Sequence, residues 1–241
     1  MIRKKSNLII MVLIVFQYLI GAQSPDIDKI MKEYYKSNGL DKLKNVKTIF
    51  MSGTITRNDL MPIKISKMRP DKYRMDFELA DLEAVQAYDG KTGWSVAPWT
   101  GNPKATAMDK ETLKEIKVSA DFEGILYKYK EKGHSAELAG KDSVENQEVY
   151  KIKLTRNDGG TEYYFISTDG YKLLRRVSKR LIRGKEVEVV NNYNNYKDVN
   201  GIKFPFVVET QMGGQRYSLI EYETIELNSD FDEKIFSMPA N

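Results

Sequence analysis

The stretch of sequence that decides the fold runs from Val46 to Phe77 and reads VKTIFMSGTITRNDLMPIKISKMRPDKYRMDF. Within it, apolar and polar residues alternate over three runs, at 49–55, 61–65 and 73–77. A period of two is typical of β-strands that turn one face to a core. Only the turn-forming sequences Asn58-Asp59 and Pro70-Asp71 separate the runs. Because connections this short join antiparallel neighbours, the stretch predicts a three-stranded meander.

The same period continues through most of the chain. Further strands are predicted at 85–88, 93–97, 149–156, 161–166, 173–181, 187–196, 202–208 and 217–227. Asn157-Asp158-Gly159-Gly160 is a strong hairpin signal between two of these runs. In the last run the apolar residues change parity near Thr224, which predicts a β-bulge or sharp bend there. The pattern indicates about ten or eleven antiparallel strands.

Two segments have helical spacing instead. The first begins at Ser24-Pro25, a suitable N-cap and first helical residue, and ends near Asn38-Gly39. The second lies in the middle of the chain, from Asp109 to Lys132. Gly124 lies inside it, and a glycine costs about 1 kcal/mol relative to alanine in a helix interior. One continuous helix and two shorter helices that break between 119 and 124 therefore both fit the pattern.

These elements predict a mainly β (α+β) fold. A sheet of ten or eleven strands cannot stay flat, because neighbouring strands are rotated by about 20 to 25 degrees. We expect a curved antiparallel sheet that forms an open or half β-barrel, with the N-terminal helix and the central helical insertion covering its concave face. No linker-like stretch divides the strands, so residues 23–241 are expected to form one domain.

The N-terminus has the layout of a secretory signal peptide. Arg3, Lys4 and Lys5 precede an apolar run at residues 8–20, which would span only about 20 Å of a hydrocarbon core about 30 Å thick. Gly21-Ala22-Gln23 follows, so we expect residues 1–22 to be removed after Ala22 and no stable membrane anchor to remain. A retained anchor helix is the alternative.

Composition excludes several classes of function. Removal of the three basic residues lowers the 38 basic residues to 35, against 34 acidic ones, so the case for a nucleic-acid partner disappears. The chain has one histidine, His134, and no cysteine, which excludes the usual zinc sites, disulfides and lipidation of the chain itself. It also lacks the sequence motifs of hydrolases and nucleotide-binding enzymes. We therefore expect a protein that is not an enzyme and needs no cofactor.

Some charged pairs are compatible with chemistry or anion binding, but ordinary strand surfaces account for them. The carboxylates Asp76 with Glu78, and Glu186 with Glu188, have the spacing that places both on one strand face. A solvated sheet face shows the same pattern. The basic stretch from Arg175 to Arg183 is interpreted as an edge or outer face with charges that resist aggregation.

The apolar residues of the strands and the central helical segment are the candidate binding residues. A curved sheet either fills its concave face with side chains or leaves an apolar cavity, and methionines make an adaptable wall for a flexible ligand. The expected lining residues are Met51, Ile63, Ile65, Met75, Phe77, Trp94, Trp99, Phe122, Leu126, Phe204 and Phe206. A packed core without a cavity is the alternative.

Five segments carry a resemblance to a known family. They are GLDKL at 39–43, MRPDKYR at 68–74, AYDGKTGW at 87–94, ADFEG at 120–124 and YKDVNGIKFP at 196–205. With the order of elements and the ending Asp232, Phe236 and Met238-Pro239, the chain resembles the outer-membrane lipoprotein-sorting protein (LolA-like) family, and within it an uncharacterised branch from Bacteroidetes-type bacteria.

The resemblance implies a function. Members of this family are periplasmic carriers with an open β-barrel closed by a helical lid, so it implies a monomeric periplasmic protein of a Gram-negative bacterium that shelters a lipid or an acylated ligand, lipoproteins included. In the best-known carriers an arginine of the barrel contacts the lid. The sequence assigns this role to no single arginine, and Arg74 has the strand parity opposite to Tyr73, Met75 and Phe77. An envelope sensor or protein-interaction module with the same fold is the alternative function.

Overall fold

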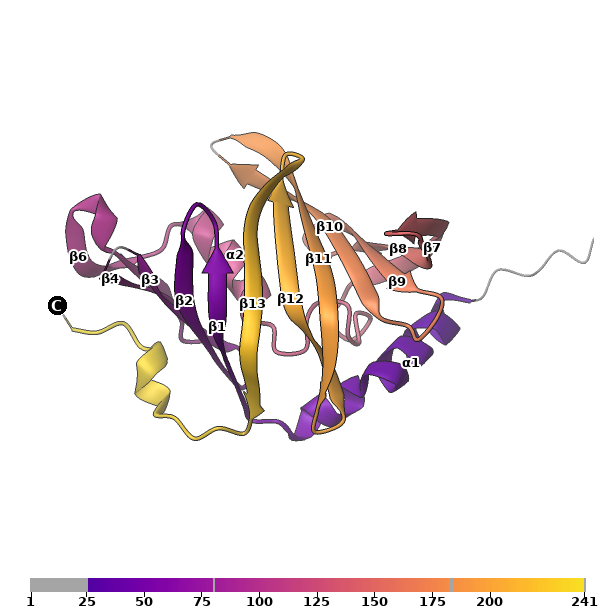
Figure 1. Ribbon diagram of the computed structural model, residues 1–241, viewed down its shortest axis with the longest axis horizontal. Helices are drawn as coiled ribbons and strands as arrows, with labels where there is room; N and C mark the ends of the chain where they lie inside the picture. Colours follow the sequence, from indigo (N-terminus) through magenta and orange to yellow (C-terminus); the bar gives the residue numbers. More distant parts are fainter. Residues whose placement is uncertain (1–25, 80, 183, 241) are drawn as a thin grey trace, which may run out of the picture.

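The computed structural model describes residues 26–79, 81–182 and 184–240. They form one antiparallel sheet of 13 strands in the order β6-β5-β4-β3-β2-β1-β13-β12-β11-β10-β9-β8-β7. The sheet is strongly curved and remains open between β6 and β7 (Figure 1). The strands are β1 Thr48–Thr56, β2 Leu60–Met68, β3 Lys72–Leu79, β4 Leu82–Tyr88, β5 Gly93–Ala97, β6 Asn102–Ala107, β7 Ser135–Val144, β8 Gln147–Thr155, β9 Thr161–Ser167, β10 Leu173–Ile182, β11 Lys185–Val199, β12 Ile202–Met212 and β13 Gln215–Leu227.

The half-barrel and the mainly β class are confirmed, but the predicted strand count was too low. The two additional strands are β6 and β7, in segments for which no strand was predicted. Both are edge strands, with one neighbour each. In β6 only Ala105 is buried, and in β7 only Val144. An edge strand that buries so little has no reason to alternate strictly between apolar and polar residues, so its periodic signal is weak.

The predicted N-terminal helix is present. Helix α1 spans Ile27–Asn38 and its N-cap is Asp26, whose carboxylate accepts a hydrogen bond from the backbone N–H of Asp28. The predicted start at Ser24-Pro25 and the predicted signal peptide lie outside the described residues. Gly39 ends the helix in the left-handed conformation, at φ 67°, as a glycine C-cap does. A 3-10 helix, η1 Leu40–Asn45, follows and leads into β1.

The central helical segment is broken, which decides between the two alternatives for it. Helix α2 spans Lys110–Ala120, and the carboxylate of Asp109 caps it by accepting the backbone N–H groups of Glu111 and Thr112 at 2.9 Å. Turns replace the helix from residue 122 to residue 133. Gly124 has a φ of 81° there, a left-handed conformation that a regular α-helix does not contain.

Helices and turns cover the concave face of the sheet as predicted. Side chains of α1 and of the turns at 125–129 pack on the inward-facing residues of β8 and β9, in a cluster that includes Ile30, Met31, Leu126, Ile152 and Ile166. In Figure 1, α2 and these turns lie behind the sheet, and α1 runs along its lower end. The concave face of β8 and β9 is therefore covered by packed side chains.

The predicted bulge in the last strand is confirmed. Ser52 of β1 pairs with Thr224, but the next residue, Gly53, pairs with Tyr222, so β13 contains one additional residue at this point. The glycine is required by close packing: a Cβ atom on Gly53 would lie 2.1 Å from the carbonyl oxygen of Glu221. Beyond the bulge Ile225 and Leu227 face the same side as Tyr222, which explains the change of parity in the sequence.

The opposite, convex face carries the C-terminal segment on β3–β5. A 3-10 helix, η3 Glu233–Phe236, lies there (Figure 1). Arg74 donates to the carbonyl oxygen of Ile235 at 2.6 Å, and the indole N–H of Trp94 donates to that of Phe236 at 2.8 Å. Phe236 is fully buried by this contact.

Candidate functional site

The concave face of β1, β2, β3 and β13 carries one continuous apolar surface. Strand register places Met51 opposite Ile65 and Ile65 opposite Met75, while Ile63 faces Phe77. These five predicted lining residues therefore share one face and belong to one cluster. Its other members are Ile55, Met61, Tyr73, Leu79, Ile220 and Tyr222. We call this set the apolar wall.

The apolar wall is buried in part and exposed in part. Burial raises the pKa of both Tyr73 and Tyr222 above the ordinary tyrosine value. Ile63 and Ile65 are buried, whereas Met51, Met75 and Phe77 are only partly buried. The methionines and the phenylalanine thus expose part of their apolar surface on the concave side, where another apolar molecule can contact it.

Four other predicted lining residues are packed as core. Phe122 and Phe206 belong to a cluster with Ile49 and Ile202, and Phe204 packs against its edge. Leu126 lies in the cluster under α1. Phe122, Leu126 and Phe206 are each at most 6% exposed. In this part of the concave face these residues form a packed core.

The two tryptophans lie in different places. Trp94 pairs with Ala87, and Ala87 with Arg74, so its ring is on the convex face under the C-terminal segment. The prediction that Trp94 lines the concave face is corrected accordingly. Trp99 lies in a short 3-10 helix, η2 Pro98–Thr100, after β5. Its ring is 49% exposed, and its centroid is 5.8 Å from that of Phe77, at the end of the apolar wall.

A pocket of about 490 Å³ lies between α2 and the strand ends. Tyr73 and Gln86 line it from the concave face, and Ile116 and Ser119 line it from α2. Further lining residues lie in or next to the turn after β1 and at the strand ends of β10, β12 and β13: Arg57, Arg180, Leu181, Ile182, Met212 and Tyr217. We call this pocket the mouth. Because Tyr73 also belongs to the apolar wall, the mouth and the wall are continuous.

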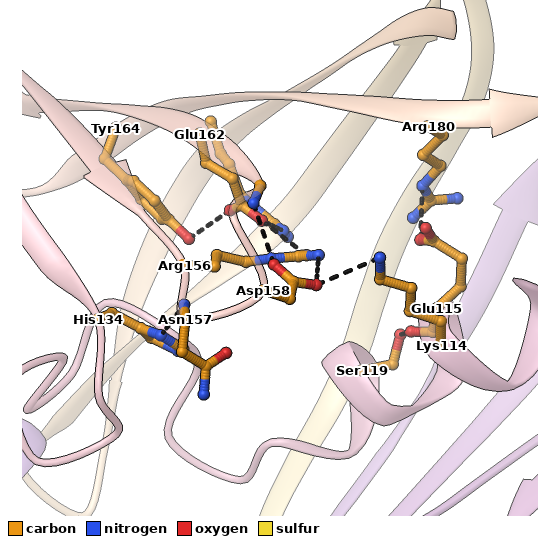
Figure 2. Close-up of polar contacts among 12 residues, drawn as sticks. Lys114, Glu115, Ser119, His134, Arg156, Asn157, Asp158, Glu162, Tyr164 and Arg180 are labelled. Carbon is orange, nitrogen blue, oxygen red and sulfur yellow. Dashed lines mark hydrogen bonds and ion pairs between the residues drawn. The ribbon is translucent and has the colours of Figure 1, made fainter. Parts of the chain in front are cut away.

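Helix α2 crosses the concave opening from one side of the sheet to the other. On one side Ile116 and Ala120 pack against Tyr88 of β4, with Tyr73 beside them. On the other side, Lys114 contacts Asp158 of the β8–β9 turn at 3.2 Å, and Glu115 contacts Arg180 of β10 at 2.8 Å (Figure 2). All four charged side chains of these pairs are between 36% and 54% exposed, so water screens both contacts.

A buried charge network holds the turn that receives Lys114. Glu162 of β9, 3% exposed, makes two hydrogen bonds with Arg176 of β10, at 2.7 and 2.9 Å, and accepts one from the hydroxyl of Tyr164 at 2.7 Å. Arg156 contacts Glu162 at 3.4 Å and Asp158 at 2.5 Å (Figure 2). Burial by itself raises the pKa of Glu162, but the hydrogen bonds and charge of Arg176 outweigh it and lower that pKa. The side-chain hydrogen bonds of Arg156 lower the pKa of Asp158.

His134 supports the same turn. Its Nδ1 accepts the backbone N–H of Asn157 at 3.1 Å (Figure 2). Partial burial, together with the charges of Lys132 and Arg156, lowers the pKa of His134. A neutral imidazole is the form that can accept at Nδ1. The contact thus gives His134 a structural role at the β8–β9 turn.

The five segments that carry the family resemblance meet at the other end of the half-barrel, which we call the closed end. Arg69 donates to the carbonyl oxygens of Val46 at 2.8 Å and Leu43 at 2.7 Å, pairs with Glu123, and stacks 4.3 Å over the ring of Phe122. At the same end, a Cβ on Gly39 would lie 2.0 Å from the carbonyl oxygen of Gly201, and one on Gly90 would lie 3.0 Å from the Asp71 carboxylate. The resembling segments therefore build the architecture of the closed end, and they contribute Tyr73 to the lining of the mouth.

Arg69, in the turn between β2 and β3, contacts the segment after α2 through Glu123 and Phe122. Beside it, Lys67 donates to the carbonyl oxygen of Asp121 at 2.9 Å, and burial lowers the pKa of Lys67 to about 8. Arg74 instead pairs with Asp76 on the convex face, as its parity predicted. Sequence reasoning missed both Arg69 and Glu162. Glu162 had a readable signal, because it shares the parity of Tyr164 and Ile166 on a strand whose inward face is apolar.

The described residues contain neither a candidate metal site nor a helix that could span a membrane. Across residues 26–79, 81–182 and 184–240, no three histidine, cysteine or acidic side chains come together in an arrangement that could hold a metal ion. In the same part of the chain, no helix is both long enough and apolar enough to cross a bilayer.

Comparison with known proteins identifies the fold through structure alone. No family model matches the sequence, and no curated protein matches it significantly. A LolA superfamily protein from Nitrosomonas europaea superimposes with a TM-score of 0.59 at 13% identity, over 89% of this chain and 98% of the other. A DUF1329 family protein from Desulfovibrio piger gives 0.60 at 11% identity, over 86% and 97% of the two chains.

A third solved structure agrees with these two. It is a candidate outer membrane lipoprotein-sorting protein domain from Vibrio parahaemolyticus, with a TM-score of 0.54 at 11% identity, over 86% of this chain and 94% of the other. The resemblance to a Bacteroidetes-type branch stays a prediction. The chain has the fold of the LolA superfamily and the outer membrane lipoprotein-sorting proteins, as the resemblance predicted.

Proposed function

We propose that this protein is a non-enzymatic carrier that shelters the acyl chain of a lipid or lipid-modified ligand against the apolar wall. The observation that carries the proposal is the continuity of a half-exposed apolar wall with a mouth of about 490 Å³. Pockets for small ligands have volumes of about 300 to 1,000 Å³. Two of the structural neighbours are named for the LolA superfamily and for outer membrane lipoprotein sorting, which is consistent with this use of the fold.

The chemistry of the wall favours a flexible apolar ligand. Each buried methylene group contributes about 0.8 kcal/mol of transfer free energy, so an acyl chain gains affinity from contact area without specific hydrogen bonds. Met51 and Met75 present thioether side chains on neighbouring parts of this surface. Because methionine has several accessible rotamers and is polarizable, it adapts to chains of different shape.

Helix α2 serves as the cover of the site in this proposal. Its two ion pairs to the far side of the sheet are exposed, and exposed pairs contribute only about 0.2 to 1 kcal/mol each. Ion pairs of this strength hold α2 over the mouth, and breaking them costs little free energy. By contrast, the turns at 121–132 are fixed by Arg69, Lys67 and a two-pronged contact of Lys132 with Asp121 at 2.7 Å. We therefore assign movement to α2 and a fixed role to the turns.

The carboxylates of the buried charge network do not favour catalysis. Glu162 and Asp158 are both engaged by arginines, and both have a lowered pKa. A general acid needs a raised pKa near the working pH, so these groups have the opposite shift. This reasoning supports a binding role.

The cellular setting belongs to the same proposal. We infer that residues 1–22 direct export and are removed, that residues 23–241 form one domain, and that the protein acts as a monomer in the periplasm. Lipoproteins are one class of acylated ligand that the mouth would admit. The alternative function is an envelope sensor or protein-interaction module. The open sheet favours a specific form of it, in which a peptide strand adds to one of the edge strands β6 and β7.

Uptake of a fluorescent fatty acid, combined with native mass spectrometry of the purified protein, tests the carrier. The double variant Met51→Gln and Met75→Gln keeps the side-chain length but makes the apolar wall polar, so it should weaken uptake by about tenfold or more. Lys64→Gln is the matched control, because Lys64 is exposed and has the opposite parity on β2. An empty protein that takes up no fatty acid, and whose affinity for a strand peptide depends on β6 or β7, would support the alternative.

A further inference from the structure

A small pocket under the turns after α2 is lined by several groups that can donate hydrogen bonds. Its volume is about 140 Å³. Tyr164, Arg176 and Tyr193 line it from β9, β10 and β11, Tyr34 lines it from α1, and the turn at 123–127 lines it from the opposite side. A space of about 15 Å³ already admits one water molecule, so this pocket has room for a polar group of a ligand. We call it the inner pocket.

Strand register places the inner pocket on the same face of the sheet as the apolar wall. Tyr193 pairs with Val208, and Val208 pairs with Ile220 of the wall, so the three side chains point to the concave side. Tyr222 of the wall lies near Tyr193, because burial raises the pKa of Tyr222 and the Tyr193 phenol raises it further. In the same way, burial and the Tyr222 phenol raise the pKa of Tyr73. A row of phenol groups therefore joins the apolar wall to the inner pocket.

Two hydroxyl groups of the inner pocket keep a hydrogen that a ligand can accept. Tyr164 donates its hydroxyl hydrogen to Glu162 at 2.7 Å (Figure 2). Across the described residues, by contrast, the hydroxyls of Tyr34 and Tyr193 donate to no protein acceptor. Burial raises the pKa of both tyrosines, so both stay protonated. The charge of Arg176 and a hydrogen bond from it partly counteract this effect at Tyr193, but a guanidinium only donates, so the hydrogen of Tyr193 remains available.

The charges at the inner pocket are already compensated. Its two charged lining residues are Arg176 and Glu123. Arg176 makes two hydrogen bonds with Glu162, and Glu123 pairs with Arg69. The buried charge network behind the pocket likewise contains two arginines and two carboxylates. A carboxylate or phosphate of a ligand would be a buried anion without a cation of its own, which is costly. A neutral carbonyl oxygen accepts hydrogen bonds and brings no charge.

We propose that the inner pocket binds the carbonyl group of an acyl ester or amide through the hydroxyls of Tyr34 and Tyr193, while the acyl chain runs past Tyr222 along the apolar wall. This proposal deepens the carrier function and rests on it, because it names the class of ligand and its orientation in the same site. A carbonyl oxygen has two lone pairs, so one oxygen can accept from both hydroxyls. Neutral acylated molecules therefore bind more tightly than free fatty acids do.

Competition against the apolar fluorophore N-phenyl-1-naphthylamine tests the proposal on purified protein freed of bound lipid. The competitors have chains of equal length: dodecane, methyl dodecanoate, N-methyldodecanamide and, at mildly alkaline pH, dodecanoate. The ester, the amide or both should bind about tenfold more tightly than dodecanoate, and the tighter of the two identifies the linkage. Tyr34→Phe and Tyr193→Phe should each weaken binding of that competitor by about fivefold and leave the affinity for dodecane unchanged.

Tyr163→Phe is the matched control, because Tyr163 precedes Tyr164 on β9 and has the opposite parity. It should change the affinity for no competitor. A second readout is the carbonyl resonance of methyl dodecanoate or N-methyldodecanamide labelled with ¹³C, which hydrogen bonds move downfield. The downfield shift should decrease in Tyr34→Phe and Tyr193→Phe and persist in Tyr163→Phe. Circular dichroism checks that each variant folds, and because the two tyrosines lie in different elements, either variant alone is sufficient.

Two results would overturn the proposal. One is binding of the ester and the amide that neither tyrosine variant weakens. The other is tighter binding of dodecanoate than of both neutral competitors, which would identify an anion site. In either case displacement of the fluorophore by dodecane would leave the carrier function standing. If the unaltered protein binds neither the fluorophore nor any competitor, the carrier function itself is refuted.

Discussion

Replacement of Glu162 by glutamine should be among the most destabilising conservative changes in the chain. The carboxylate is 3% exposed, makes two hydrogen bonds with Arg176 at 2.7 and 2.9 Å, and accepts a third from Tyr164. Glu162→Gln keeps the shape but removes the charge, which leaves Arg176 without its anion. Breaking one partner of a buried pair costs about 3 to 5 kcal/mol. Because Arg176 is itself 18% exposed, we expect the lower end, about 3 kcal/mol.

Urea unfolding measured by circular dichroism gives this free energy, and a double-mutant cycle isolates the pair. The double variant Arg176→Met/Glu162→Gln removes both charges. Its loss in free energy of unfolding should be smaller than the summed losses of the two single variants by about 2 kcal/mol or more. Lys179→Gln is a matched control, because its contact with Glu186 is about two-thirds exposed on both sides. It should change the stability by less than about 0.5 kcal/mol.

The dependence on pH has a definite sign. The pKa of Glu162 is lowered in the folded protein, so its contribution is fully present above the unfolded value of about 4.3 and is lost as the pH falls through the folded value. The unaltered protein should therefore lose more stability than the variant between neutral and strongly acidic pH. A loss below about 1 kcal/mol at neutral pH, or identical acid profiles, would refute the buried-pair reasoning.

Three further changes have expected outcomes. Gly53→Ala places a methyl group against the Glu221 carbonyl and should cost about 2 kcal/mol or more in urea unfolding, whereas Thr54→Ala on the opposite face should cost about 0.5. Lys114→Gln with Glu115→Gln removes the two ion pairs of α2 with Asp158 and Arg180. Release of a fluorescent fatty acid, measured by stopped flow, should then become several-fold faster at low salt. An unchanged release rate would contradict a closing role of α2. Trp94→Phe removes the hydrogen bond to Phe236 at a cost of about 1 kcal/mol, so trypsin should cut more rapidly at Lys234, and an unaltered cleavage rate would argue against that anchor.

Sequence periodicity predicted the half-barrel because inward-facing residues of the central strands are strongly selected for burial. Met51, Ile63, Ile65, Met75 and Phe77 were brought together correctly, since a period of two fixes which residues of each strand share a face. The same logic predicted a bulge near Thr224 from a change of parity, and the register places the additional residue at position 223. Edge strands bury too little to leave this pattern, which is why β6 and β7 were missed.

The contacts of the mouth could not be predicted, for a physical reason. Lys114 and Asp158, or Glu115 and Arg180, meet because α2 crosses from one part of the sheet to another, and no local pattern encodes this crossing. Trp94 was misplaced because the face of β5 depends on its register across the turn at 89–92, and a shift of one residue reverses every side chain. Glu162 could have been found, since a charged residue at a core parity needs a partner on a neighbouring strand.

The central claim is that an apolar ligand lies against the apolar wall under α2. Photo-cross-linking with a diazirine-labelled fatty acid, followed by peptide mapping, tests it most directly. The account predicts labels on peptides of β1, β2, β3 and β13 and on α2, with labelling reduced in the Met51→Gln/Met75→Gln variant and unchanged in Lys64→Gln. Labels confined to the convex face around Trp94 and η3, or labelling that an unlabelled fatty acid does not compete away, would contradict the account.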